Sequence, residues 1–438
     1  MSFEIARMAI NSVSGALDVI SNNIANANSY GYKSQRANFS AMYAGNVANG
    51  TQISSITESI TKTGGVRNTG GSMDAMITDR GFFAVRDPSG QVQFTRVGMF
   101  NIDKDGFVID ANGRKVQGYA AFRDASGQLI SGAALGQLGD LQIETGQIGA
   151  VASTKLAYSG NLSAGWKQLS AAAFNMDDPT TFNSSVTSSV FDSKGTKHTV
   201  TQYFVKTGAS EVAVFNSVDG ALPQNEVTAP VPPAPGVYDP DTYLTFNSKG
   251  LLVHADPNLA TVPVPLPDPE LDDPIDTKYN YSFTPLTGGA NPVTLEIDYA
   301  AMTQYSGDAS TLVNNANGNA SGMLNGTSIG ADGSIIATYS NGQSQVVGTL
   351  AIATFANPSG LRAGANTSWV SSVDSGTPLF STPGSATASP LAVGALEDSN
   401  VDLTGELVNL MSTQRNYQAN TKVIAAESEM MQSLMQAI

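Results

Sequence analysis

Apolar residues at the start of the chain follow a heptad-like spacing. Steps of three or four residues give an unbroken apolar series: Phe3, Ala6, Ile10, Val13, Leu17, Ile20, Ile24 and Ala27. This spacing is typical of a helix that packs along one narrow line. Asn26, Asn28 and Gly31 then predict where the helix ends.

A second series closes the chain. Ser399 with Asp402 three residues later resembles a capping box. The series that follows is mostly apolar: Leu403, Leu407, Leu410, Gln414, Tyr417, Thr421, Ile424, Ser428, Met431, Met435 and Ile438. Two ordinary core helices would fit both patterns. The apolar end at Ile438 and the polar residues within the second seam instead favour oligomerisation arms that fold on assembly, because polar seam positions fix register and partner number.

The region between the two helices has the pattern of β-structure. Short apolar runs alternate with turn signals such as Asp105-Gly106 and Asn341-Gly342. We therefore expect a mainly β protein with long terminal α-helices that pair as a coiled-coil-like arm. The expected order is nested, with a helical arm (1–28 and 400–438), a connecting segment (29–71 and 389–399), an inner β domain (72–165 and 301–388) and an inserted outer β domain (166–300).

Proline is concentrated in one part of the expected outer domain. Twelve of the 20 prolines lie between Pro223 and Pro274. Proline favours extended backbone and donates no backbone hydrogen bond. We therefore expect an extended surface loop over residues 223–274.

Composition narrows the classes of function. Only 13% of the 438 residues are charged and the net charge is -15, so nucleic acid is an unsuitable partner. There is no Cys, which excludes disulfides, thiol catalysis and Cys-ligated metals. No apolar run is long enough to cross a membrane, and the N-terminus lacks the pattern of a cleaved leader. We expect neither membrane insertion nor a cleaved signal peptide.

The candidate chemistry is weak. Asn101, Asp103 and Asp105 match the first half of an EF-hand loop, but Asn112 stands where a bidentate Glu is needed and the flanks have strand patterns. A hairpin turn fits better. His198 and His254 are the only histidines, and neither has a sequence neighbour that suggests a catalytic triad. We expect no catalytic, cofactor or metal site.

Several motifs resemble those of the bacterial flagellar rod and hook family. The first is Ser21-Asn-Asn-Ile-Ala-Asn-Ala-Asn-Ser-Tyr-Gly-Tyr-Lys33, and Phe94 to Gly106, Ala353 to Leu361 and Ser399 to Leu403 continue the resemblance. The family-motif positions at the two ends are Asn22, Asn23, Ala25, Asn26, Gly31, Tyr32, Lys33, Gln414, Arg415, Asn416 and Tyr417. The large insertion, with Val190 to Gly195 and His198, is similar to the outer domain of hook members, whereas rod members lack such an insertion.

The resemblance implies a structural subunit that polymerises with copies of itself. Hook members form a curved helical tube that joins motor to filament, transmits torque as a universal joint and encloses the export channel. Implied partners are the distal rod protein, the hook cap, the hook–filament junction proteins and the type III flagellar export apparatus. The implied location is outside the cell, in the basal body and hook of the flagellum.

Three alternatives stay open at this point. A distal rod or hook–filament junction protein would share the terminal motifs. A soluble β-rich enzyme would be a monomer whose activity survives loss of both arms. A surface adhesin would explain the β domains but not the paired terminal seams.

Overall fold

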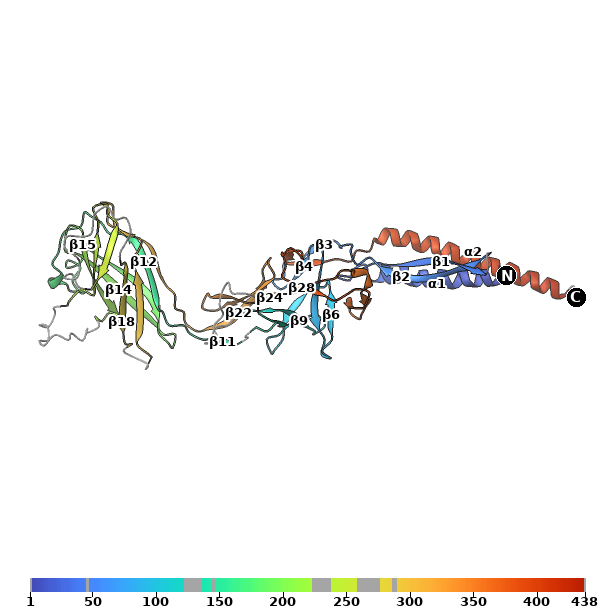
Figure 1. Cartoon of the computed structure of the whole chain (residues 1–438), viewed down its shortest axis with the longest axis horizontal. Coiled ribbons are helices and arrows are strands. Elements are labelled where there is room, and N and C mark those ends of the chain that lie inside the picture. The colour runs from blue at the N-terminus through green and yellow to red at the C-terminus, as the bar shows by residue number, and fades with distance from the viewer. Residues whose placement is uncertain are drawn as a thin grey trace. The chain divides into compact units, whose positions relative to one another are not determined.

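Two long helices bracket a chain that is otherwise built of strands. In the computed structural model, α1 (Ser2–Ala25) begins the chain and α2 (Leu403–Gln436) ends the described part (Figure 1). The structure describes residues 2–44, 47–121, 136–143, 146–222, 238–257, 276–285 and 290–436. The expected class, mainly β with terminal helices, is confirmed.

The chain divides into two units. Unit 1 holds Met1–Thr145, Leu324–Thr338 and Ser344–Ile438, and unit 2 holds Gly146–Met323 and Tyr339–Gln343. The nested order therefore agrees with expectation, but the inserted unit is larger than residues 166–300. The reason is that β12 (Lys155–Asn161) and β21 (Ser310–Ala316) pair with each other and belong to unit 2.

Unit 2 is a sandwich of two sheets. The first sheet is antiparallel throughout and has the order β13 (Ser184–Phe191), β14 (Lys197–Lys206), β15 (Glu211–Val218), β16 (Thr242–Phe246), β17 (Leu252–Asp256). The second has the order β18 (Lys278–Phe283), β19 (Val293–Asp298), β12, β20 (Met302–Thr303), with β21 beside β12. Strand β12 runs parallel to β19 and β20 and antiparallel to β21.

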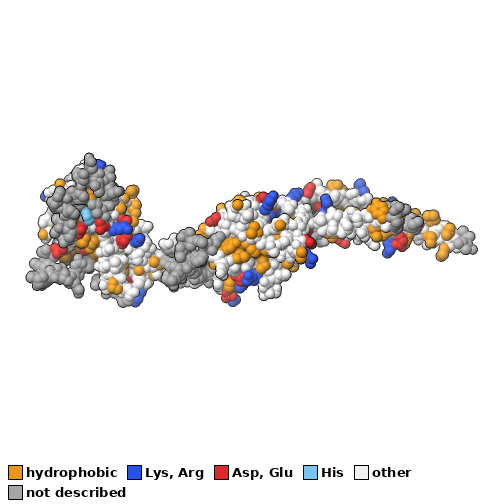
Figure 2. Space-filling view, viewed as in Figure 1, with side chains coloured by type: hydrophobic (Ala, Val, Ile, Leu, Met, Phe, Trp, Pro, Cys, Tyr) orange, Lys and Arg blue, Asp and Glu red, His pale blue; other side chains and the backbone are white. Residues whose placement is uncertain are grey.

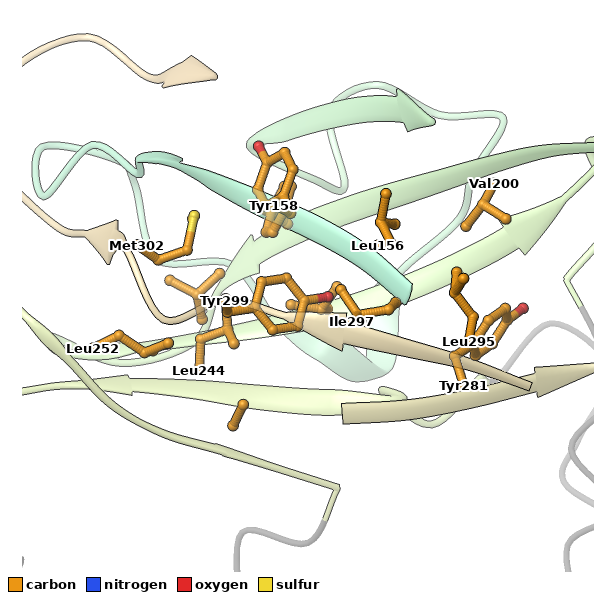
Figure 3. Packing of buried hydrophobic residues seen from close by; sticks show 14 of the residues in the cluster. Leu156, Tyr158, Val200, Leu244, Leu252, Tyr281, Leu295, Ile297, Tyr299 and Met302 are labelled. Atoms are coloured by element: carbon orange, nitrogen blue, oxygen red, sulfur yellow. The ribbon is translucent and has the colours of Figure 1, made fainter. Parts of the chain in front are cut away.

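Side chains from both sheets meet in one core (Figure 3). Tyr158 of β12 and Leu295 of β19 lie in the same buried cluster as Phe204 of β14. The other face of the first sheet is also covered, since Phe174 stacks on Phe215 with ring centroids 4.0 Å apart. Strand β15 is therefore buried on both faces, which explains why its residues 212–215 form a continuous apolar run rather than an alternating one.

The expected loop over residues 223–274 is wrong in its central part. Residues 242–246 and 252–256 form the paired strands β16 and β17. No proline lies between residues 242 and 256, so nothing prevents ladder hydrogen bonds there. The proline-rich residues 223–237 and 258–275 lie outside the described residues.

Unit 1 is built on a longer sheet. Along it lie β23 (Ser334–Tyr339), β24 (Ser344–Leu350), β9 (Lys115–Ala120), β5 (Phe82–Arg86), β6 (Val92–Thr95), β27 (Ser368–Val370) and β26 (Arg362–Ala363). Joined to them are β7 (Phe100–Ile102), β8 (Val108–Asp110), β10 (Leu138–Asp140), β25 (Ile352–Thr354) and β28 (Leu379–Ser381). Phe82, Phe94 and Trp369 form the centre of its core.

Short strands complete the framework. In unit 1, β3 (Val66–Asn68) pairs with β30 (Ala395–Glu397), and β4 (Ala75–Ile77) pairs with β29 (Leu391–Val393). In unit 2, β11 (Gln147–Ile148) pairs with the first residues of β22 (Gly322–Ile329). The pair β3–β30 joins the two connecting segments of the chain, and β4–β29 joins the second of them to the start of the inner β domain.

The first connecting segment is itself structured. Residues 35–58 form a long antiparallel hairpin of β1 (Gln35–Ala44) and β2 (Val47–Glu58). The hairpin packs on α1, where the Ser12 hydroxyl donates to the Thr51 carbonyl at 2.8 Å. A Cβ at Gly15 would lie 2.7 Å from the Ile53 side chain, so glycine permits the close approach of helix and hairpin.

One turn design closes five hairpins. Each has Asp or Asn followed three residues later by Gly, at Asp87, Asp103, Asp110, Asp192 and Asn247. The side-chain Oδ1 accepts hydrogen bonds from the backbone N–H groups two and four residues ahead. The glycines take positive φ, from 76° at Gly113 to 90° at Gly90. The EF-hand resemblance at Asp103 is thus a hairpin turn, as expected.

The Asp110 turn is expected to carry more stability than its neighbour at Asp103. Asp110 also forms an ion pair at 2.7 Å with Arg114, and both side chains are nearly fully buried. Asp110→Ala leaves the buried guanidinium of Arg114 without its counter-charge. It should lower the free energy of unfolding of unit 1 by about 3–5 kcal/mol. The matched change Asp103→Ala should cost about 1 kcal/mol because water reaches that turn. Urea unfolding followed by Trp369 fluorescence measures both, and equal losses would contradict the expectation.

Candidate functional site

Helix α2 exposes a long apolar surface. Its exposed large apolar side chains are Leu403, Leu407, Val408, Met411, Tyr417, Val423, Met430, Met431, Leu434 and Met435. Figure 2 shows hydrophobic side chains on the surface at the end of unit 1 that holds α2. No residue of the described helix is fully buried. So many exposed large apolar side chains on one helix indicate an interaction site.

The two helices lie side by side and contact each other. A cavity of about 240 Å³ lies between α1, β1 and α2 and is lined on the α2 side by polar residues, Glu406, Asn409, Ser412, Thr413 and Asn416. On the α1 side it is lined by apolar residues such as Val13 and Ile20. The two helices therefore pair, as expected, with the α2 seam positions Leu410 and Ile424 half-buried and the other described seam positions of α2 exposed.

The predicted seam residues have different surroundings. On α1, Ile20 is buried, Ile10, Val13, Leu17 and Ile24 are half-buried, and Phe3 is exposed. The buried face of α1 lies beside the seam and contains Ser12, Ala16, Val19 and Asn23. On α2, Leu410 and Ile424 are half-buried, whereas Leu403, Leu407, Tyr417, Met431 and Met435 are exposed. Ile438 lies outside the described residues.

The end of α2 has few contacts of its own. Every residue from Ser428 to Gln436 is exposed. Figure 1 shows these last turns extending past the start of α1. The methionines in this stretch are therefore open to a partner, and their flexible side chains suit an adaptable apolar contact.

Asn23 connects three elements at the base of the helices. Its Nδ2 donates to the Gln35 carbonyl at 2.8 Å and to Glu406 Oε1 at 2.9 Å. Its Oδ1 accepts from the Gln35 N–H at 2.9 Å and from the Tyr32 hydroxyl at 3.3 Å. Asn23 is only 1% exposed. All of its polar atoms are satisfied, so it fixes the end of α1 to β1 and to the first turn of α2.

Lys33 reaches a buried carboxylate on the returning chain. Its Nζ lies 2.6 Å from Glu397 Oε1 and donates to the Lys62 carbonyl at 2.7 Å. Arg96 Nη1 lies 3.5 Å from Glu397 Oε2. The side chains of Lys33 and Glu397 are fully buried. Burial lowers the pKa of Lys33 and of Arg96, and Glu397 opposes both shifts.

Gly31 is the residue that this geometry requires between Asn23 and Lys33. Its φ is +65°, and a Cβ there would lie 3.1 Å from the backbone of Arg96 and Val97. Its N–H donates to the Glu397 carbonyl at 2.8 Å. Only glycine combines this conformation with so close a backbone approach.

The remaining motif residues have local roles. Asn26 donates from its side chain to the Asn22 carbonyl at 2.9 Å, which closes the last turn of α1. Asn22, Ala25, Gln414 and Arg415 are exposed, and Asn416 borders the cavity between the helices. Among the motif residues, Asn23, Gly31, Tyr32 and Lys33 converge on one junction, whereas those of α2 do not join it.

Four residues at this junction were not among the predicted site residues. They are Arg96, Glu397, Asn400 and Glu406. Asn400 accepts from the Ser34 N–H at 2.7 Å and donates to the carbonyls of Ser59 and Lys62. The sequence signal for these residues was weak. Asn400 lies within the family-like motif from Ser399 to Leu403, whereas Glu397 precedes that motif.

The histidines do not form a catalytic pair. His198 lies on β14 and His254 on β17, with two strands between them in the sheet. Buried His198 has both ring nitrogens against carboxylates, Nδ1 at 2.7 Å from Asp219 and Nε2 at 3.4 Å from Asp192. Burial alone would lower the pKa of His198, but its hydrogen bonds to Asp219 and Asp192 outweigh burial and raise it.

Among the described residues, no group of three or more His, Cys, Asp or Glu side chains is placed to hold a metal ion. Within the same residues, neither helix is both long and apolar enough to span a membrane.

Comparison with known proteins agrees with the terminal junction and the nested β units. Four family models match this chain: Flagella basal body rod protein (residues 3–33), Flagellar hook protein FlgE/F/G D1 domain (76–164), Flagellar basal body protein FlaE D2 domain (161–319) and Flagellar basal body rod FlgEFG protein C-terminal (392–437). The flagellar hook protein FlgE of Salmonella typhimurium is 32% identical over 437 residues, covering 99% of both chains.

The chain belongs to the flagellar hook protein family.

Other hook proteins support this membership. Flagellar hook protein FlgE of Escherichia coli is 31% identical over 437 residues, and that of Treponema pallidum is 31% identical over 458 residues, with 96% of this chain covered. The crystal structure of Helicobacter pylori flagellar hook protein FlgE2 has a TM-score of 0.51 at 14% identity. It covers 76% of this chain and 99% of that chain, and it shows the likeness of fold. The hook subunit described here is therefore a structural component of the flagellum, outside the cell, in a family whose members polymerise.

The buried carboxylate of Glu397 should dominate the stability of the junction. Glu397→Gln leaves Lys33 and Arg96 as buried cations without a counter-charge and should lower the free energy of unfolding of unit 1 by about 3–5 kcal/mol. The adjacent Asp398 pairs with a half-exposed Arg67, so Asp398→Asn should cost under about 1 kcal/mol. Urea unfolding compares the two variants, and a small loss for both would contradict the assigned role.

Unit 2 should lose stability as the medium becomes alkaline. Because the folded-state pKa of His198 is raised, its contribution is complete below the unfolded pKa near 6.5 and is lost as pH rises through the folded value. We expect the urea midpoint of unit 2 to fall between about pH 6 and pH 9 and His198→Gln to abolish that fall. Trp166, which packs against the core of unit 2, reports this transition in a Trp369→Phe background. An unchanged pH slope in His198→Gln would refute the assignment.

Proposed function

We propose that copies of this hook subunit assemble through their terminal helices into a curved helical tube. The tube encloses the export channel and acts as a universal joint that transmits torque from motor to filament. The observation that carries this proposal is the set of exposed apolar side chains on α2, which one chain leaves uncovered. Burying each such side chain stabilises a contact by about 1.5–3 kcal/mol.

The proposed division of the chain follows from that assembly. Residues 1–28 and 400–438 form the inner wall of the tube, with Phe3, Ile10, Leu403 and Leu407 among the residues that face neighbouring copies. Residues 29–71 and 389–399 connect the helices to the inner β domain, and unit 2 forms the outer domain. This arrangement gives the half-buried seam of α1 and the exposed surface of α2 partners in other subunits.

The partners proposed beyond the subunit itself are those of a hook. They are the distal rod protein, the hook cap, the hook–filament junction proteins and the type III flagellar export apparatus, which would export the chain without a cleaved signal. The support is the match to rod and hook families at both ends of the chain. We assign the chain no catalytic role, since both ring nitrogens of His198 already face carboxylates.

The surface composition supports outer domains that slide past one another as the hook turns. Only 13% of the residues in the chain are charged, and 43 are Gly. Contacts between Ser, Thr, Asn and Gly are weak and interchangeable, whereas ion pairs would hold one register. Neighbouring outer domains therefore have many contact registers of similar energy.

The end of α2 offers a direct test of assembly. Met431→Gln with Met435→Gln removes two exposed apolar side chains that lie beyond the contacts of α1. We expect this variant to keep the monomer's unfolding transition and to lose tube formation, seen by electron microscopy and sedimentation.

The matched control changes two polar residues of the same exposed stretch. Glu429→Gln with Ser433→Gln alters exposed positions outside the seam without removing apolar surface, and it should assemble like the unchanged chain. Normal tubes from the methionine variant would show that these methionines are not assembly contacts. Loss of tubes in both variants would contradict a specific role for the apolar side chains.

A further inference from the structure

Unit 1 contains a cavity beside the junction that none of the roles above uses. Its volume is about 740 Å³, and its walls include Ile60, Phe82, Arg96, Phe355, Leu379 and Ala386. Phe82 is buried in the core, whereas Leu379 is 57% exposed and lies where the cavity meets solvent. The walls also include polar residues such as Thr61, Thr354 and Ser389, so the cavity combines mixed walls with one deep cationic group. We call it the Arg96 cavity.

The charges around Arg96 do not balance. Lys33, Arg96 and Glu397 are all buried, so two cations share one carboxylate and one positive charge is left over. Buried charges are stable only when they are paired and hydrogen-bonded. Asp79 and Arg80 also line the cavity, and both are exposed. The carboxylate of Asp79 favours the charged form of Arg96. With these two residues included, three cations face two carboxylates, so one positive charge is still left over around the cavity.

The hydrogen bonds of Arg96 are also incomplete. Its Nε is buried and has no hydrogen-bond acceptor, and its Nη1 has only the ion-pair contact with Glu397 at 3.5 Å, although the residue is only 3% exposed. Its guanidinium lies 5.0 Å from the centroid of the Phe82 ring, which holds the plane of the group in place. A fixed guanidinium with free donors is suited to bind a carboxylate.

We propose that the Arg96 cavity receives an Asp or Glu side chain from a second copy of this chain. The carboxylate pairs with Arg96, and its aliphatic stem packs against Phe82, Phe355 and Leu379. This inference rests on the proposed assembly into a tube and adds a contact between β domains to the contacts of the terminal helices.

Two observations favour a second copy as the occupant. A helical polymer of one subunit requires contacts in which a surface of one copy fits a different surface of the next. The chain carries 37 acidic residues against 22 basic ones, so a neighbouring copy offers many carboxylates to one deep cationic cavity. A contact of this kind completes the charge balance of the junction only in the assembled state.

Cross-linking in the assembled polymer tests the proposal. In Arg96→Lys, the lysine amine can attack a carboxylate that a carbodiimide has activated, which forms an amide and releases the carbodiimide as its urea. Tubes grown from a mixture of isotopically heavy and light chains distinguish cross-links within a copy from those between copies. We expect mass spectrometry to find residue 96 of one copy joined to an Asp or Glu of another. Cross-links confined to Glu397 or Asp79 of the same copy would overturn the proposal.

A second variant leaves the buried cluster intact. Ala386 is exposed and lines the cavity, so Ala386→Trp fills the space without changing Arg96. We expect it to raise the concentration needed for tube growth at least about tenfold, with unchanged monomer unfolding. Ala111→Trp, at an exposed turn position away from the cavity lining, is the matched control and should have no such effect.

The outcomes separate this inference from the proposed function. Tubes that form equally well from Ala386→Trp and the unchanged chain overturn the cavity contact and leave assembly through the helices standing. Failure of the unchanged chain to form tubes under any condition contradicts the proposed assembly, and with it the partner assigned to the cavity.

Discussion

The rest of unit 1 depends on one buried carboxylate. Glu397 accepts from Lys33 at 2.6 Å and from the Gly64 N–H at 2.9 Å, and it lies 3.5 Å from Arg96. Lys33 lies between α1 and β1, Gly64 follows the hairpin, and Arg96 directly follows β6 of the inner sheet. The charge of a buried carboxylate must be compensated. These segments therefore cannot separate without exposing the carboxylate to water or leaving it without a cation. The position of both helices relative to the inner sheet follows from this constraint.

Around that point, polar side chains rather than apolar ones define the geometry. Asn23 and Asn400 each satisfy several backbone groups where the chain changes direction, and Gly31 permits the approach of two backbones. Such fully satisfied polar networks specify one arrangement more strictly than apolar contact does. The apolar surface of α2 is thereby left free for other subunits.

The sequence predicted which helices and strand regions form better than it predicted which of their faces are buried and which distant residues pair. Both helices and the nested β order could be predicted because heptad spacing and turn signals are local patterns. Which seam positions of α2 one chain leaves exposed could not be predicted, since a heptad pattern does not say whether its partner lies in the same chain. Glu397 was missed because its partner Lys33 is 364 residues away. Strands β16 and β17 were missed because a count of prolines over a wide window hid a proline-free stretch.

The long sequence separation within the junction also governs the order of folding. The contact between Asn23 and Glu406 spans 383 residues, so a chain that emerges from its N-terminus has completed α1 long before its partner exists. Closing so large a loop is slow compared with forming a single helix. Unit 2 can reach its native state as soon as residue 343 is available, whereas the helical arm must wait for the last part of the chain. The arm is therefore the last region of the subunit to become rigid.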